Sequence, residues 1–263
     1  MNTMAQAPAR RVWRASPLVL TAILLAWALA LASEFTGTPG WVHHHHLLTP
    51  GMAAWASVGL FLAAWQIHIA AMMLPSTLPM IGHFRHMAAA QPHPVAARSV
   101  FLVGYLIVWT GFGIAASLAY LGVHAVVEQW HWLASRPQVG VGGVLILAGA
   151  FQFSGLKDRC MEKCRHPVAF LMAHYQRGIP AALRVGLRHG LFCLGCCWAL
   201  MLVMFAVGIA NLAWMAPLAL LMLYEKTGKA GDRIVRPVGM VLILLGLAMM
   251  LFMGPMPVEH HHG

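Results

Sequence analysis

The sequence predicts an all-α, polytopic transmembrane helix bundle of about seven spans. Hydrophobic residues make up 60% of the 263 residues and charged residues only 9%, and the mean hydropathy is +0.72. A chain of this composition has too few polar side chains to cover the surface of a soluble domain. Its apolar residues also form runs of roughly 20, the length that crosses a hydrocarbon core about 30 Å thick.

Seven apolar runs are expected to span the membrane, and residues 1–263 are expected to form a single integral membrane domain. The sixth run is short, and Gly208 and Asn211 predict a tight turn before it; a single kinked helix is the alternative there. The seven runs are Pro17 to Ser33, Met52 to Leu74, Val100 to Gly122, Val139 to Leu156, Gly190 to Gly208, Leu212 to Tyr224 and Val238 to Met253.

The first run resembles a signal sequence, because Arg10, Arg11 and Arg14 precede it. It reaches Leu31 without a small-residue cleavage site, so we expect it to remain as the first helix.

Basic residues lie between the apolar runs and predict the orientation. The net charge of +10 would suggest nucleic acid in a soluble protein, but basic residues between spans face anionic headgroups instead. We therefore expect a lipid bilayer as partner, in a bacterial inner membrane, and no nucleic acid. The densest basic stretches, residues 157–188 and 226–236, reach the cytoplasm together only if the N-terminus is inside and the C-terminus outside.

That orientation separates the cysteines from most of the histidines. The cysteines fall on the cytoplasmic side, where thiols stay reduced, so we expect no disulfides. The outer side receives His43 to His46, His124, His131 and His260 to His262. The tract His43 to His46 and the terminal His260 to His262 could gather Cu²⁺, Zn²⁺ or Ni²⁺ outside the membrane. The alternative for His260 to His262 is a truncated tag.

The cysteines form the most specific chemical pattern. Cys160 and Cys164 are four residues apart, and Cys196 and Cys197 follow Cys193 by three and four, so each group occupies one face of a helix. His189 precedes Cys193 by four residues and shares that face, on a helix expected to start near His189. Five thiols and an imidazole suit Cu(I), the favoured ion, or Zn²⁺. The alternatives are small packing residues or a redox use of Cys193, Cys196 and Cys197.

The second span carries a further candidate pair. His68 and Met72 are four residues apart, and an ionisable residue within a span usually faces the bundle interior. An imidazole and a thioether would suit Cu(I). The alternative is that Met72 fills a gap and His68 bonds to a neighbouring helix.

Several motifs resemble, in the same order, those of an uncharacterised family of predicted metal-binding integral membrane proteins. The resemblance extends over about residues 52–229 and departs from the family where His68 and Ala210 replace methionine. It implies the membrane fold and a metal, but no reaction. The matching stretches are residues 71–76 with Pro79, 156–160, 164–167, 170–171, 186–190, 193–198, 211–215 and 225–226.

Enzyme signatures are missing from the sequence: there is no Walker loop, dinucleotide fingerprint, His-Glu-x-x-His helix or nucleophile elbow. Two functions remain. One is a membrane protein that handles a soft metal in transport or homeostasis, with a possible membrane or periplasmic protein partner. The other is a non-transporting subunit or assembly factor of a larger complex with a structural metal or thiol site.

Overall fold

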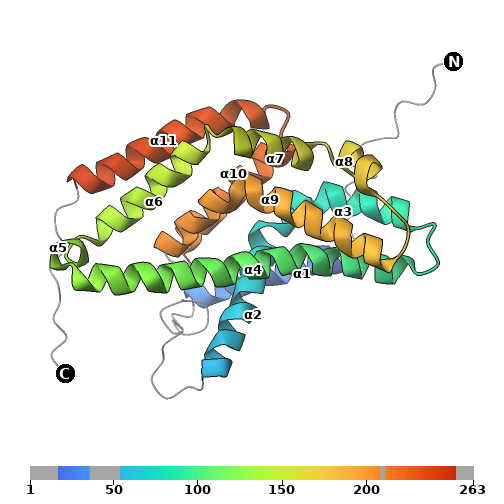
Figure 1. Cartoon of the computed structure of the whole chain (residues 1–263), viewed down its shortest axis with the longest axis horizontal. Helices are drawn as coiled ribbons and strands as arrows, with labels where there is room; N and C mark the ends of the chain where they lie inside the picture. The colour runs from blue at the N-terminus through green and yellow to red at the C-terminus, as the bar shows by residue number, and fades with distance from the viewer. Residues whose placement is uncertain (1–16, 36–53, 208–210, 253–263) are drawn as a thin grey trace.

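The computed structural model describes residues 17–35, 54–207 and 211–252, and all regular structure among them is helical (Figure 1). This confirms the all-α prediction. The helices are α1 (Pro17–Phe35), α2 (Ala54–Met72), α3 (Leu74–Ala88), α4 (Pro94–Gln129), α5 (His131–Ala134), α6 (Pro137–Phe151), α7 (Gly155–Arg165), α8 (Pro167–His174), α9 (Ile179–Val207), α10 (Leu212–Thr227) and α11 (Gly231–Phe252).

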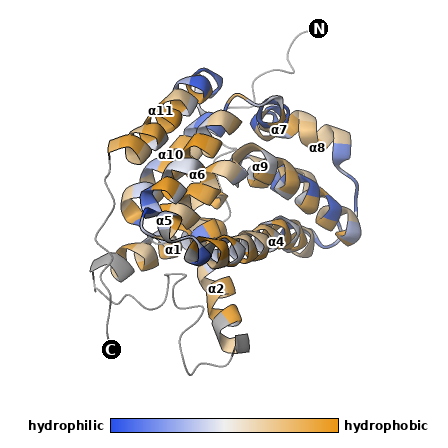
Figure 2. Ribbon diagram, turned by 60° about the vertical axis from the view of Figure 1, so that its left-hand side comes forward, coloured by the Kyte–Doolittle hydropathy of each residue, from blue (hydrophilic) through white to orange (hydrophobic). Residues whose placement is uncertain are grey.

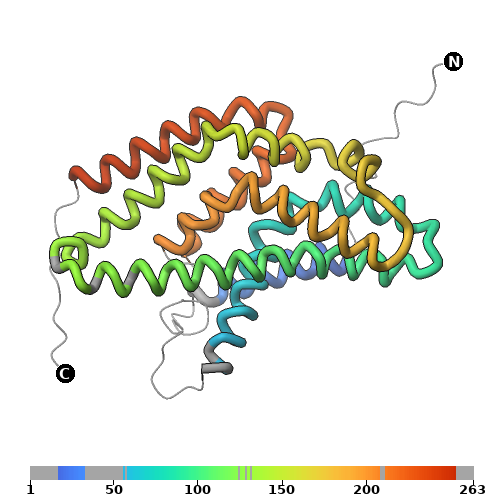
Figure 3. The backbone as a smooth tube through the Cα atoms, viewed as in Figure 1, coloured from blue at the N-terminus to red at the C-terminus, as the bar shows by residue number. Residues whose placement is uncertain are grey.

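Three described helices, α4, α9 and α11, are long and apolar enough to cross a membrane. Two more spans result if each bent pair counts as one: α2 with α3, bent by 73°, and α6 with α7, bent by 67° (Figure 3). The described residues therefore supply three to five candidate spans. The predicted seven spans and the orientation of the termini stay predictions, and so does the single integral membrane domain.

Two segments predicted as loops are helical, which corrects the sequence interpretation. The segment after the second span contains α3, and residues 157–189 contain most of α7, all of α8 and the first part of α9. In α9, Arg184 and Arg188 are exposed while Val185 and His189 are buried. The charges that lowered the local hydropathy thus form one face of an amphipathic helix.

The break between α2 and α3 results from proline. Pro75 has no N–H to donate to the carbonyl of Ala71, and the indole of Trp27 donates to that oxygen instead, at 3.0 Å. Ser76 and Thr77 both donate to the carbonyl of Met73, at 2.9 and 3.1 Å. The chain can therefore turn inside the bundle with these carbonyls bonded.

Glycines allow the closest helix contacts. Helix α4 packs mainly on α9, and α6 on α11, as Figure 1 shows. Gly186 of α9 lies directly against the backbone of Phe101, and a Cβ on Gly149 of α6 would come within 2.6 Å of the Gly239 carbonyl of α11. Such small-residue contacts are typical of helices packed in membranes.

The predicted turn between the fifth and sixth spans lies partly outside the described residues, because residues 208–210 are not described. The described residues on either side belong to α9, up to Val207, and to α10, from Leu212, and the tight turn between them stays a prediction. Asn211 caps α10 by accepting a hydrogen bond from the backbone N–H of Ala213 at 3.1 Å. The predicted outer histidines His43 to His46 and His260 to His262 also lie outside the described residues.

Candidate metal centre

Helix α9 contributes three adjacent thiols from its middle. The sequence prediction placed them near the start of a helix at His189, but α9 begins at Ile179, so Cys193 lies well inside it. Cys193, Cys196 and Cys197 are all at most 1% exposed. The thiols of Cys196 and Cys197 donate to the carbonyl of Cys193, at 3.0 and 2.8 Å. Both sulfurs are therefore held beside Cys193.

Helix α7 brings a fourth thiol to this group. The sulfurs of Cys164 and Cys196 are 3.9 Å apart. Cys160, one turn earlier, packs on Gly195, where an added Cβ would lie 2.5 Å from the Cys160 sulfur. The predicted convergence of the two cysteine groups therefore holds most closely for Cys164, and all five cysteines are free thiols.

A thioether and a phenol complete the surroundings of the thiols. The Cys197 thiol lies 3.8 Å from Sδ of Met73, at the break between α2 and α3. Tyr105 of α4 places its hydroxyl 3.2 Å from the Cys193 sulfur. The thiols therefore lie where α3, α4, α7 and α9 meet, and Met73 is a methionine in contact with a thiol.

Lys226 of α10 places a buried ammonium among the thiols. Its Nζ lies 3.1 Å from the Cys193 sulfur, 3.8 Å from the Cys197 sulfur and 3.2 Å from Oγ of Ser76. The side chain is 5% exposed, and within the described part of the chain it forms no ion pair with a carboxylate. A buried cation requires a partner of opposite charge, and the nearest atoms that can supply one are the thiol sulfurs.

A second buried lysine is neutralised separately. Nζ of Lys157 lies 2.7 Å from Oε2 of Glu225, with both side chains at most 1% exposed, and also donates to the carbonyl of Cys196 at 3.2 Å. Arg165 donates to the carbonyls of Glu225 and Gly228. Glu225 therefore pairs with Lys157 of α7 and not with its chain neighbour Lys226.

Comparison with known proteins gives the family. The model of a family described as PpoB2, copper chaperone, matches residues 62–249. The chain belongs to this copper chaperone family. The match includes every residue of the cluster just described, and the family description supports a copper-related function and metal binding. Searches of curated proteins and of solved structures found no match.

The sulfur spacing of this copper chaperone family member fits a bound metal ion. With metal–sulfur bonds of about 2.3 Å, two thiolates on one ion are ~3.8 Å apart at a tetrahedral angle and ~4.6 Å apart in a linear complex. The Cys164–Cys196 distance of 3.9 Å lies in this interval. No group of three or more His, Cys, Asp or Glu side chains among the described residues is already arranged as a metal site. One pair of sulfurs, on Cys164 and Cys196, thus has the separation of two ligands on one metal ion.

The predicted histidine ligands are buried, and among the described residues neither forms a hydrogen bond with a thiol. His189 is 3% exposed, stacks on Tyr105 with ring centroids 5.6 Å apart, and both ring nitrogens lack hydrogen-bond partners. His68 is 3% exposed, stacks on Trp65 and has an unpartnered Nε2. Met72 is fully buried. His189 and the His68–Met72 pair therefore stay candidates, each outside the thiol cluster.

Sequence reasoning missed Met73, Lys157 and Lys226 as cluster residues. All three lie within or beside stretches that carried the family resemblance. The sequence of α10 also indicated that Lys226 needs a partner of its own, because consecutive helical residues point about 100° apart. Glu225 and Lys226 therefore cannot face the same neighbour, and each needs its own partner.

Proposed function

We propose that the chain is a membrane-embedded copper chaperone that carries Cu(I) on two thiolates supplied by the group Cys164, Cys193, Cys196 and Cys197. One observation supports this most strongly: thiols from α7 and α9 converge around the buried ammonium of Lys226. Copper is the cargo, Cu(I) is favoured over Zn²⁺, and the site lies in the bacterial inner membrane.

The charges around the cluster favour a monovalent ion. Lys157 and Glu225 neutralise each other, which leaves Lys226 as the cation that faces the thiols. Cu(I) held by two thiolates carries one negative charge, which the Lys226 ammonium balances. Thiolate and thioether donors also select Cu(I) over hard ions.

The α9 side of the site is buried, Cys164 is partly exposed, and the sulfur donors differ in strength. The α9 thiols are at most 1% exposed, and Met73, whose Sδ touches Cys197, is fully buried. A neutral thioether binds Cu(I) less strongly than a thiolate does, so Met73 suits an ion that is passing on or off the thiolates. We propose that the ion is then passed to a membrane or periplasmic protein partner.

Cu(I) binding by single-cysteine variants tests this proposal. The protein is purified in detergent without a histidine tag, and Cu(I) affinity is measured by competition with a chromophoric chelator. We expect about one Cu(I) per chain and at least a ~10-fold loss of affinity in Cys193→Ser and Cys164→Ser, since each replaces a soft donor by a hard hydroxyl. Cys160→Ser, on the same helix as Cys164, is the matched control and should retain affinity within about twofold.

Equal affinity in the wild type and in Cys193→Ser and Cys164→Ser would refute the thiol site. Zinc in place of copper in the purified protein would favour a structural metal in a subunit or assembly factor. Copper uptake into proteoliposomes that contain this protein distinguishes a transporter from a chaperone. Accumulation of copper inside the vesicles indicates transport, and copper binding without flux indicates a chaperone.

A further inference from the structure

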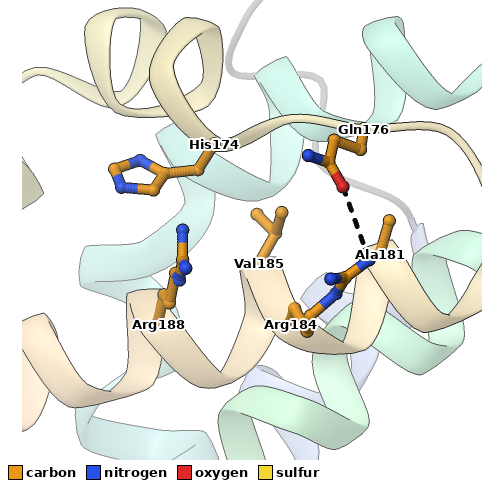
Figure 4. Close-up of a pocket in the computed structure, with 6 residues that line it drawn as sticks. All are labelled: His174, Gln176, Ala181, Arg184, Val185 and Arg188. Carbon is orange, nitrogen blue, oxygen red and sulfur yellow. Dashed lines mark hydrogen bonds between the residues drawn. The ribbon is translucent and has the colours of Figure 1, made fainter.

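A basic cavity lies between the end of α8 and the first turns of α9, away from the thiols. Its volume is about 50 Å³. Figure 4 shows His174 and Arg188 on one side and Gln176 and Arg184 on the other. Ala181 and Val185, which are 4% and 2% exposed, form an apolar floor. The cavity therefore combines basic walls with an apolar base.

The guanidinium groups at this cavity are available to an anion. Arg184 makes a hydrogen bond of 3.4 Å to Oε1 of Gln176, which is long for such a contact. The ion pairs formed among the described residues involve Lys157 and Arg165, not Arg184 or Arg188. Arg184 and Arg188 are one turn apart on the same face of α9. Each presents a fork of N–H donors that matches the oxygens of a phosphate.

The surface around the cavity changes from basic to apolar over a short distance. Along α9 beyond Pro180, the exposed side chains are Arg184, Arg188 and then Leu191, which is 58% exposed. Arg188 and Leu191 are separated by ~4.5 Å along the helix axis. Met172 of α8 is also 78% exposed. Figure 2 shows the same change, from hydrophilic colour at the α8–α9 connection to hydrophobic colour further along α9. Such a boundary is expected at headgroup depth.

We propose that this cavity binds the phosphate group of an anionic membrane phospholipid, whose acyl chains lie along Leu191 and Met172. The proposal rests on the membrane embedding included in the proposed function. Basic pockets between helices at the cytoplasmic surface bind anionic headgroups by the same chemistry. Since α9 runs without interruption from this cavity to Cys193, the bound lipid fixes the depth of the thiols in the membrane.

Native mass spectrometry of the full chain in a neutral detergent tests the site. Phosphatidylglycerol and phosphatidylcholine are added at equal concentration to the wild type, to Arg184→Gln/Arg188→Gln, and to the control Arg159→Gln/Lys163→Gln. The control removes two exposed charges one turn apart on α7, so both variants change the net charge equally. We expect the wild type and the control to retain phosphatidylglycerol over phosphatidylcholine, and Arg184→Gln/Arg188→Gln to lose that preference by at least ~10-fold, as expected for charge-assisted hydrogen bonds.

Three results would overturn the proposal. They are equal retention of phosphatidylglycerol by Arg184→Gln/Arg188→Gln and the wild type, equal retention of the two lipids by the wild type, and full displacement by millimolar inorganic phosphate. The last result would assign a soluble phosphate ligand. Alkaline carbonate extraction of membranes distinguishes a failure of the lipid-binding proposal from a failure of the proposed membrane-embedded function. A chain that is extracted is not membrane-embedded, whereas one that resists extraction but lacks lipid preference contradicts only the cavity.

Discussion

The buried ion pair between Lys157 and Glu225 gives the largest predicted effect on stability. The two side chains are 1% and 0% exposed, and their charged atoms are 2.7 Å apart. Removing one partner leaves the other charge buried without compensation, which costs about 3–5 kcal/mol. We therefore expect Lys157→Met and Glu225→Met each to lower the free energy of unfolding by that amount.

The double variant Lys157→Met/Glu225→Met should recover most of this loss. An apolar pair of similar volume avoids the desolvation of two charges, so replacing a buried ion pair in this way is often neutral. Unfolding in mixed micelles, followed by far-UV circular dichroism, gives the free energies. The control is Arg159→Met, an exposed residue of the same helix, which should change stability by no more than about 0.5 kcal/mol. The reasoning fails if either single variant behaves like Arg159→Met, or if the double variant loses the sum of the single losses.

Three further predictions concern single residues. Lys226→Met should weaken Cu(I) binding at least ~10-fold, because a charge-assisted hydrogen bond contributes about 1.5–3 kcal/mol. Lys226→Arg keeps the charge and should keep most of the affinity. Both affinities are measured by chelator competition, and equal Cu(I) affinity of Lys226→Met and the wild type would contradict the role of the charge. Gly186→Ala should destabilise the protein by about 1–3 kcal/mol, since its Cβ would overlap the Phe101 backbone. The control in the same unfolding assay is Gly155→Ala, which adds a Cβ in open space. Equal stability of the two variants would exclude the close contact at Gly186. Trp27→Phe should cost about 1 kcal/mol by removing the donor to the Ala71 carbonyl, and an unchanged unfolding free energy would show that this hydrogen bond does not matter.

Hydropathy predicted the helices better than it predicted their ends. It identified an apolar segment from Gly190 onward, but α9 begins at Ile179. An average over a window treats Arg184 and Arg188 as a loop, although their four-residue spacing places both on one exposed helical face. For the same reason, the cysteines appeared to lie at the end of a span rather than inside it.

The local part of the site could be predicted, and the part built by distant residues could not. The spacing of Cys193, Cys196 and Cys197 fixes their shared face within one helix. The contact of Lys226 with Cys193, in contrast, joins residues 33 positions apart, and that of Met73 with Cys197 joins residues 124 apart. Such contacts depend on how the helices pack, which the periodicity of one sequence does not encode.

X-ray absorption at the copper edge of the Cu(I)-loaded protein tests the thiolate site most directly. We expect a first shell of two or three sulfur atoms, without nitrogen or oxygen, because the thiols of Cys164, Cys193, Cys196 and Cys197 are the donors that converge. In the variant Cys193→Ser/Cys196→Ser this sulfur shell should be lost or partly replaced by lighter atoms. A wild-type shell of nitrogen or oxygen donors, or an unchanged spectrum in the double variant, would contradict copper binding by these cysteines.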